Sequence, residues 1–202
     1  MKENNNEVVQ LLINYTKENN IILELNTKNE DGYYPFLYGI INVVERNDKK
    51  TLHLLIKYAK ENNIVLDINE KNINSDCPLL HAIRKNNLEM VQFLFNYAKE
   101  NNIIVLNIIK ENHYCFFKYP TVYAVYKGNI EIIQLLFNYI KENNIILDIN
   151  DHCNSKGENL LLYVIFNDDI SMVKLLISYA EENNIILKIN KKSIKGQFLF
   201  LL

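Results

Sequence analysis

The chain has 202 residues, three cysteines and a formal net charge of −2. This near-neutral charge argues against nucleic acid as the main partner, because phosphate binding requires a basic surface, and three cysteines cannot form a disulfide framework. Roughly a sixth of the residues are asparagine, whereas glycine (5) and proline (3) are scarce. Asparagine-rich chains can be disordered, but 49% hydrophobic residues favour a packed core, and so little glycine and proline disfavours an all-β fold.

The sequence shows no targeting or membrane segment. Residues 1–6 are polar and lead into an amphipathic stretch, so the apolar part of a signal peptide is missing. The longest apolar runs, such as residues 198–202, are far too short to span a membrane. We therefore expect an intracellular, cytoplasmic protein with free thiols and no membrane partner.

An internal repeat organises the sequence. The string Lys-Glu-Asn-Asn occurs four times and Glu-Glu-Asn-Asn once, at intervals of 39–43 residues. These strings begin at Lys17, Lys60, Lys99, Lys141 and Glu181. Each follows an apolar stretch that ends in tyrosine and precedes a piece rich in Ile, Leu and Val. A period of this length predicts a stack of supersecondary units rather than one globular core.

In chain order, the sequence predicts an orphan second helix over residues 7–18, then four complete repeats. The repeats cover about residues 27–69, 70–109, 110–150 and 151–190, and a partial repeat covers 191–202. Together they form a single array over 1–202. The first complete repeat has four additional residues between Pro35 and Asn47, about one helical turn. The last residues of the chain, 198–202, are apolar, which suggests that the chain belongs to a longer array or that its end docks onto another surface.

Each repeat contains two segments with helical periodicity. In the second complete repeat they run from Pro78 to Lys85 and from Leu88 to Glu100. A two-residue break separates the segments, and its first residue tolerates the left-handed conformation that a tight turn demands. This residue is Asn4, Asn47, Asn86, Gly128 or Asp168 in the five copies. The asparagine pair after each second segment is predicted to end that helix in the same way.

One stretch of the repeat matches a known residue pattern. Pro78 to Leu94 follow T-P-L-H-x-A-A-x-x-G-H-x-E-I-V-K-L-L without a gap, and Lys127 to Leu136 follow its second half more closely. Asp31 to Pro35 resembles the turn D-G-x-T-P. In these residues the chain resembles the ankyrin repeat family. The resemblance implies an all-α solenoid of helix-turn-helix pairs joined by extended finger loops.

The chain departs from that family in three places. A longer link, with Lys-Glu-Asn-Asn-Ile-Ile-Leu as its usual form, replaces a short Gly-Ala link, which indicates a divergent subtype. Leu80 and Val122 occupy the family's histidine position, so its hydrogen-bonding motif is lost. Ser75 and Phe117 stand where the family prefers glycine.

The resemblance also implies a function: a protein–protein interaction module that is not an enzyme and needs no cofactor. In the family, partners contact the finger tips and the exposed first helices. The third finger is rich in aromatic residues, which supply interface hot spots, unless these side chains collapse onto the first helices. The candidate partner-binding residues are Tyr33, Tyr34, Arg84, Lys85, Tyr114, Phe116, Phe117, Tyr119, Tyr126 and Lys127.

Two other functions stay open. The chain could be a structural spacer or fragment of a longer repeat protein with no ligand of its own, as a monomer or part of that array. Alternatively, thiol or metal chemistry could use the pairs His113/Cys115 or His152/Cys153, although no C-x-x-C or H-x3-H spacing exists. With no Gly-rich phosphate loop and no distinguished nucleophile, we predict no catalytic, cofactor or metal site.

A tyrosine recurs near the end of every second helix. Its five positions are Tyr15, Tyr58, Tyr97, Tyr139 and Tyr179. These rings could form an aromatic ladder for a ligand. However, an identical residue in every repeat favours packing between repeats, with the hydroxyl reaching a neighbour or solvent.

Overall fold

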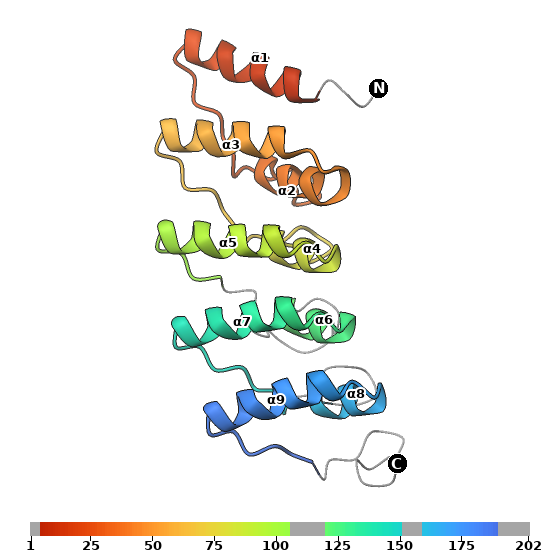
Figure 1. Ribbon diagram of the computed structural model, residues 1–202. Coiled ribbons are helices and arrows are strands. Elements are labelled where there is room, and N and C mark those ends of the chain that lie inside the picture. Colours follow the sequence, from red (N-terminus) through yellow and green to blue (C-terminus); the bar gives the residue numbers. More distant parts are fainter. Residues whose placement is uncertain (1–4, 106–119, 151–158, 190–202) are drawn as a thin grey trace. The chain divides into compact units, whose positions relative to one another are not determined.

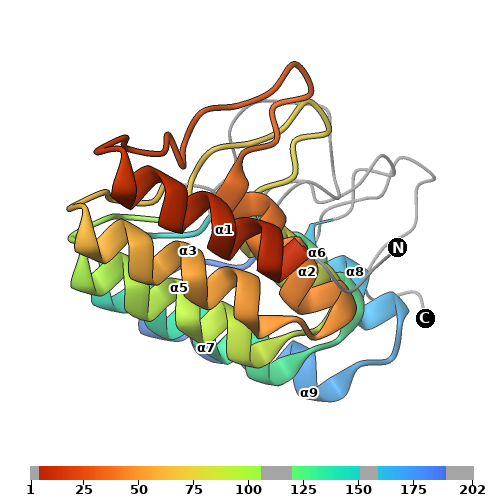
Figure 2. The same cartoon turned by 90° about the horizontal axis from the view of Figure 1, so that it is seen from above.

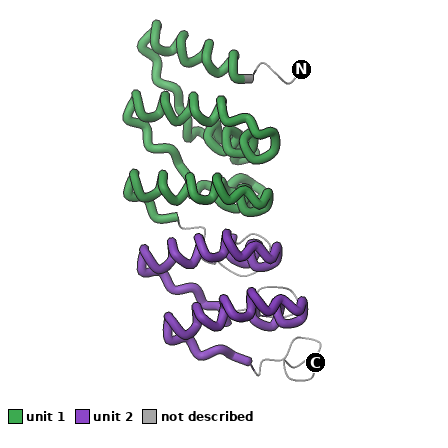
Figure 3. Tube along the Cα trace, viewed as in Figure 1, with its two compact units in different colours: residues 1–105 green, residues 106–202 purple. Residues whose placement is uncertain are grey.

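The computed structural model describes residues 5–105, 120–150 and 159–189, and within these ranges the regular structure is helical (Figure 1). The helices are α1 (Asn5–Glu18), α2 (Pro35–Arg46), α3 (Lys49–Glu61), α4 (Pro78–Arg84), α5 (Leu88–Glu100), α6 (Pro120–Lys127), α7 (Ile130–Glu142), α8 (Leu160–Phe166) and α9 (Ile170–Glu182). The chain divides into two compact units, Met1–Val105 and Leu106–Leu202 (Figure 3). The prediction of an all-α fold with paired helices is confirmed.

In the first unit, α2 pairs with α3 and α4 pairs with α5. Each first helix also packs on the next first helix, α2 on α4, while α1 packs on α3. Figure 2 shows α1, α3 and α5 lying side by side as one layer. Helix α2 has 12 residues where α4 has 7, which confirms the additional turn predicted for the first complete repeat.

The second unit repeats this arrangement with four helices. Helix α6 pairs with α7 and α8 pairs with α9, and contacts also join α6 to α8 and α7 to α9. Each of the second helices α7 and α9 has 13 residues, whereas α8 has only 7. None of the helices in the described part of the chain combines the length and the apolar character that a membrane crossing requires.

Local sequence explains the tight turns between paired helices. The predicted left-handed residues have positive φ angles: Asn47 (55°), Asn86 (55°), Gly128 (67°) and Asp168 (55°). The next residue is an Asp or Asn whose side chain accepts a backbone N–H of the following helix, as Asn129 does from Ile132 at 2.8 Å. The turn prediction is therefore confirmed at these four positions, and Asn4 lies outside the described residues.

The asparagine pairs end the second helices through two different devices. The side-chain amide of the first asparagine donates to the backbone carbonyl of the recurrent tyrosine, as Asn101 does to Tyr97 at 2.8 Å. The second asparagine adopts the left-handed conformation, with φ between 53° and 54° at Asn20, Asn63, Asn102, Asn144 and Asn184. The first asparagine satisfies a backbone carbonyl of the last turn, and the second ends the helix. The predicted helix ends are therefore confirmed.

The long links between repeats form hydrogen bonds along both edges, to the next repeat on one edge and to the preceding repeat on the other. In the link after α3, the Leu66 N–H donates to the Tyr97 hydroxyl of the next repeat at 2.8 Å. The side-chain amide of Asn26, from the preceding repeat, brackets the same link by accepting from the Asp67 N–H and donating to the Val65 carbonyl. Successive residues of an extended link point their polar groups to opposite sides, so the two neighbours bind without competing.

The same hydroxyl contact recurs along the chain. Tyr58 accepts from the Leu23 N–H at 3.0 Å and Tyr179 accepts from the Leu147 N–H at 2.9 Å. Tyr58, Tyr97 and Tyr179 are only 2%, 5% and 6% exposed. Burial raises the pKa of Tyr97 and Tyr179, which keeps these hydroxyls neutral. At these three positions the recurrent tyrosine is therefore a packing element between repeats, as its repetition favours, whereas Tyr15 of α1 is 57% exposed.

Candidate partner-binding surface

The two fingers described in the first unit are built alike. In the first finger (residues 27–34), the Asn29 side chain accepts from the Tyr33 N–H at 2.8 Å. In the second (70–77), the Asn72 side chain accepts from the Asp76 N–H at 2.9 Å. Gly32 (φ 76°) and Ser75 (φ 60°) hold equivalent left-handed turns, so Ser75 adopts the conformation for which the family prefers glycine.

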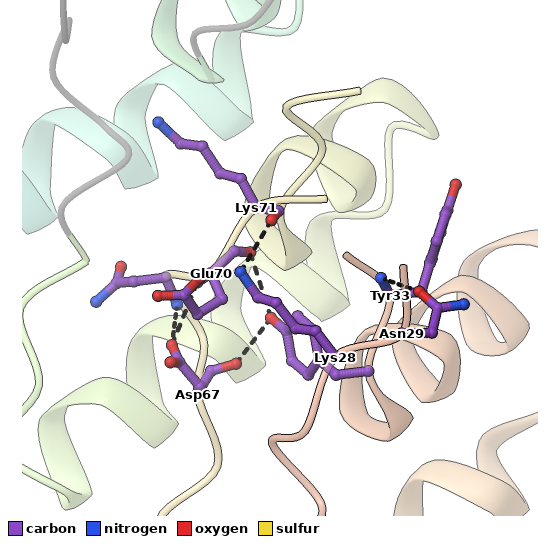
Figure 4. Close-up of polar contacts among 8 residues, drawn as sticks. Lys28, Asn29, Tyr33, Asp67, Glu70 and Lys71 are labelled. Carbon is purple, nitrogen blue, oxygen red and sulfur yellow. Dashed lines mark hydrogen bonds and ion pairs between the residues drawn. The ribbon is translucent and has the colours of Figure 1, made fainter. Parts of the chain in front are cut away.

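These two fingers are joined to each other, which preorganises the surface they present. The Lys28 ammonium group pairs with the Glu70 carboxylate and donates to the Lys71 carbonyl at 3.1 Å (Figure 4). The Ile73 N–H donates to the Asp31 carbonyl at 3.0 Å. A Cβ at Gly32 would lie 2.8 Å from the Asn72 Cα, so only glycine allows the fingers to approach this closely.

The structure separates two neighbouring tyrosines that the sequence placed together among the candidates. Tyr34 is 1% exposed, and its hydroxyl donates to the Asp67 carbonyl at 2.9 Å. Burial, followed by the nearby Asp67 carboxylate, raises the pKa of Tyr34 above its usual range. A partner could not reach this ring, so the inclusion of Tyr34 in the surface is corrected: its side chain anchors the finger to the link.

Tyr33 lies on the surface instead. Its ring stacks on that of Tyr38 in α2, with centroids 5.1 Å apart and planes inclined by 21°. Tyr33 is half-buried, whereas Tyr38 is 48% exposed. The pair presents a rigid aromatic surface where the first finger meets the first helix.

Charged side chains occupy the exposed side of α2 and α4. The Glu45 carboxylate lies 3.4 Å from the Lys85 ammonium group and 3.6 Å from His81 Nε2. Burial lowers the pKa of His81, and the Glu45 carboxylate opposes that effect. Lys85 therefore reaches the surface as part of an ion pair between helices.

Arg84, the other basic candidate on α4, points to its own finger. Its guanidinium group pairs with the Asp76 carboxylate, and the two side chains are only 27% and 16% exposed. This pair joins the helix to the finger that precedes it. Arg84 is thus engaged by Asp76 within the chain and is not part of the proposed partner-binding surface.

Tyrosines dominate the corresponding surface of the second unit. Tyr126 of α6 packs against Tyr123, with ring centroids 6.0 Å apart, and against Tyr163 of α8 at 5.8 Å. The Lys127 ammonium group lies 5.5 Å from the Tyr123 centroid and 5.7 Å from that of Tyr126. Tyr126 is 45% exposed and the other two rings are half-buried. We call Tyr123, Tyr126, Lys127 and Tyr163 the tyrosine cluster.

Sequence reasoning missed three of these aromatic residues. The fourth residue of each first helix is an aromatic or histidine side chain: Tyr38, His81, Tyr123 and Tyr163. A position-by-position comparison of the repeats would have found this pattern.

Four candidates lie outside the described residues: Tyr114, Phe116, Phe117 and Tyr119 of the third finger. The pairs His113/Cys115 and His152/Cys153 lie outside them as well. Cys77, by contrast, is buried at the start of α4, and burial raises the pKa of its thiol. This thiol is therefore inert rather than a loop-tip nucleophile. Within the described ranges, no three His, Cys, Asp or Glu side chains gather as metal ligands would.

A small open pocket lies between α3 and α5, on the side of the second helices. Leu52, His53, Ile56, Met90 and Phe93 are among its lining residues, and its volume is about 190 Å³. Small-molecule sites usually measure about 300–1,000 Å³, so this pocket is smaller than a typical ligand site.

Comparisons with known proteins agree with this architecture. A family model for ankyrin repeats in three copies matches residues 40–145, and another, for many copies, matches residues 122–177. A search of curated protein sequences finds no match. One similar solved structure is that of the Bd0816 predatory endopeptidase from Bdellovibrio bacteriovorus in complex with the immunity protein Bd3460.

The matched chain of that complex has 17% sequence identity to this one and a TM-score of 0.60, and the match covers 98% of this chain and 89% of that chain. At such low identity the likeness shows the fold alone. The family model over residues 40–145, however, covers more than half of the sequence. This chain belongs to the ankyrin repeat family.

Proposed function

We propose that this chain is a protein-binding module whose partner contacts the first helices and the fingers, and that it catalyses no reaction. Ankyrin repeat proteins typically bind other proteins and are generally non-enzymatic. The similar solved structure is an immunity protein bound to a peptidase, which is an example of such binding by that protein. Fold alone does not define a partner, so the proposal rests on the surface itself.

The observation that carries the proposal is the tyrosine cluster of the second unit. Tyr126 is 45% exposed, yet it is braced by Tyr123 and by Tyr163 from the next helix pair. Exposed aromatic residues that are already ordered lose little entropy on binding, and tyrosine is enriched among interface hot spots. Lys127 adds a positive charge beside the rings, which favours a partner surface that carries acidic side chains.

In the first unit, the Tyr33–Tyr38 stack supports the same proposal on a smaller scale. It lies beside the joined fingers, and Lys85 and Glu45 lie further along the first helices. Charged pairs at the rim of an interface contribute to orientation more than to affinity. The aromatic candidates of the third finger, Phe116 and Tyr119 among them, stay part of the proposed surface.

The experiment is a capture of partners from the source organism with immobilised protein, using matched variants. Tyr126→Ala should weaken a cognate interaction by at least about 30-fold, because truncated hot spots cost about 2 kcal/mol or more. Phe116→Ala with Tyr119→Ala tests the third finger. Gln92→Ala, an exposed change on α5, is the control and should leave affinity unchanged.

Far-UV circular dichroism should show unchanged helix content in each variant. A captured protein that binds the Tyr126→Ala variant as well as the wild type would remove the tyrosine cluster from the site. Loss of binding with Gln92→Ala but not Tyr126→Ala would place the site on the second helices instead.

The same purified protein also tests the two alternative functions, thiol or metal chemistry and a structural spacer. Thiol or metal chemistry would require Cys115 or Cys153, so metal analysis of the purified protein should find zinc in stoichiometric amounts if that alternative holds. A structural spacer would capture no partner at the first-helix face.

A further inference from the structure

The open pocket between α3 and α5 is distinct from the surface proposed above to bind a partner, because none of its lining residues belongs to that surface. Its volume is about 190 Å³, and much of its lining is apolar: Val43, Leu52, Ile56, Met90 and Phe93. An apolar cavity of about 150 Å³ is large enough to bind benzene. The pocket therefore has room for one aromatic side chain, although it is smaller than a typical ligand site.

Ile56 is the residue that leaves this space open. At the same repeat position α7 has Phe137, which is 9% exposed and whose ring stacks on Tyr179 of α9 with centroids 4.2 Å apart. Helix α5 has Phe95 at this position as well. Ile56 is smaller than phenylalanine and is only half-buried. The first unit therefore lacks, between α3 and α5, the ring that α7 places against α9 in the second unit.

The wall of the pocket favours an aromatic occupant. Phe93 is half-buried, so part of its side chain is accessible. It stands where the other second helices have leucine: Leu11, Leu54, Leu135 and Leu175. Aromatic rings pair favourably with one another, and a methionine sulfur also makes favourable contacts with a ring. An entering ring would therefore gain contacts with Phe93 and Met90 that an aliphatic side chain would not.

The edge of the pocket on α3 is basic. Helix α3 contains four lysines and one acidic residue: Lys49, Lys50, Lys57, Lys60 and Glu61. Lys50 and Lys57 precede and follow the lining residue His53 by three and four positions, so the three exposed side chains share one side of the helix. The acidic side chain that lines the pocket from α5 is Glu89, and Lys49 contacts both of its carboxylate oxygens, at 2.7 and 2.8 Å. This edge therefore favours acidic groups in a molecule that enters the pocket.

We propose that this pocket binds one aromatic side chain of a partner protein, within a segment where acidic residues flank that side chain. The ring packs against Phe93 and Met90, and the flanking carboxylates lie next to Lys50 and Lys57. A ring that fills a pocket is the usual form of an interface hot spot, and a short peptide of this kind should bind with a Kd of about 0.1–1 mM. The pocket does not depend on the first-helix surface, so its failure would leave the proposed function unchanged.

The test makes use of a chain that contains no tryptophan. The synthetic peptide acetyl-Asp-Glu-Trp-Glu-Asp-amide supplies a tryptophan signal without background, and the whole 202-residue protein is titrated into it up to about 1 mM. The emission should shift to shorter wavelength and saturate, because the ring leaves water. A peptide with lysine in place of each acidic residue should bind at least about five-fold more weakly, because its charge has the same sign as the α3 edge.

Ile56→Phe is the disruptive variant, because it fills the pocket with the residue that α5 and α7 have at this position. It should weaken binding of the acidic peptide at least about ten-fold. Ile56→Val is the matched control, which keeps the pocket open and should bind within about two-fold of the wild type. Lys50→Glu should weaken binding about two- to five-fold, whereas Lys174→Glu, the same change at an exposed position of α9, should have no effect.

Far-UV circular dichroism checks that each variant keeps its helix content. If Ile56→Phe does not, Phe93→Leu takes its place; it installs the common leucine and should weaken binding about two- to ten-fold. No change in the tryptophan emission with the wild type at about 1 mM would overturn the proposal, as would wild-type binding by a folded Ile56→Phe or Phe93→Leu variant. Equal binding of the acidic and basic peptides would overturn the acidic character of the partner segment.

Discussion

The linked edge of the repeats and the face of the first helices follow opposite rules. Along the edge, the same residues recur: a tyrosine hydroxyl accepts a leucine N–H in three described repeats, and an asparagine amide brackets the links after α3 and α9. Along the face, equivalent positions are less uniform. The fourth residue of the first helix is tyrosine in α2, α6 and α8 but His81 in α4, and Arg84 of α4 corresponds to Tyr126 of α6.

This contrast separates stacking from recognition. A contact that joins each repeat to the next must be made by every repeat, so its residues are under the same physical demand each time. A surface that recognises one partner need not repeat in this way, and at the position of Arg84 and Tyr126 it does not. The first unit has ion pairs on this face and the second has a tyrosine cluster, although both use the same helix-pair scaffold.

The sharpest test of the contrast compares one tyrosine from each region. Tyr97→Ala should lower the free energy of unfolding by about 3–5 kcal/mol, because it removes a buried ring and its hydrogen bond to Leu66. Tyr126→Ala should lower it by clearly less, about 0.5–1.5 kcal/mol, because the Tyr126 ring is 45% exposed and loses only its contacts with Tyr123 and Tyr163. Urea unfolding followed by circular dichroism measures both. Equal losses of unfolding free energy for the two variants would contradict the separation of stacking residues from recognition residues.

A smaller effect is expected from the asparagine brackets. Asn150→Ala leaves the Ile186 carbonyl and the Lys188 N–H without that partner, and should cost about 1–3 kcal/mol. Asn138→Ala, on the exposed side of α7, is the matched control and should be nearly neutral. The same unfolding measurement applies. If both variants behave alike, the amide is not a structural link between repeats.

The smallest effect concerns His81 on the variable face. Burial lowers its pKa in the folded chain below the ordinary value of 6.5, so the unfolded chain binds the proton more readily. Its contribution to stability is present above about pH 6.5 and is lost as pH falls from there toward the folded pKa.

Each pKa unit between the folded and unfolded chain corresponds to about 1.4 kcal/mol in the free energy of unfolding. His81→Tyr, which installs the residue found at this position in three other repeats, should flatten the stability profile between about pH 5 and 7.5 relative to the wild type. Thermal unfolding across that pH range provides the measurement. An identical slope in both proteins would show that His81 does not titrate in this window.

The helices, their ends and their turns follow from local sequence. Left-handed Asn47, Asn86, Gly128 and Asp168 were predictable because that conformation depends on the residue itself and its immediate neighbours. The position of Pro78 at the start of α4 and the longer α2 follow from local chemistry as well. The recurrent tyrosine was correctly interpreted as packing because every repeat contains it.

Which side chains of the first-helix face are available to a partner depends on how distant segments pack together. Tyr33 and Tyr34 are adjacent in sequence, yet one stacks on Tyr38 at the surface and the other is buried against the link that follows α3. Arg84 is held by Asp76, and Tyr126 meets Tyr163 of the next helix pair. These contacts join residues about 5 to 37 positions apart, and their outcome depends on how the elements pack rather than on local backbone preferences.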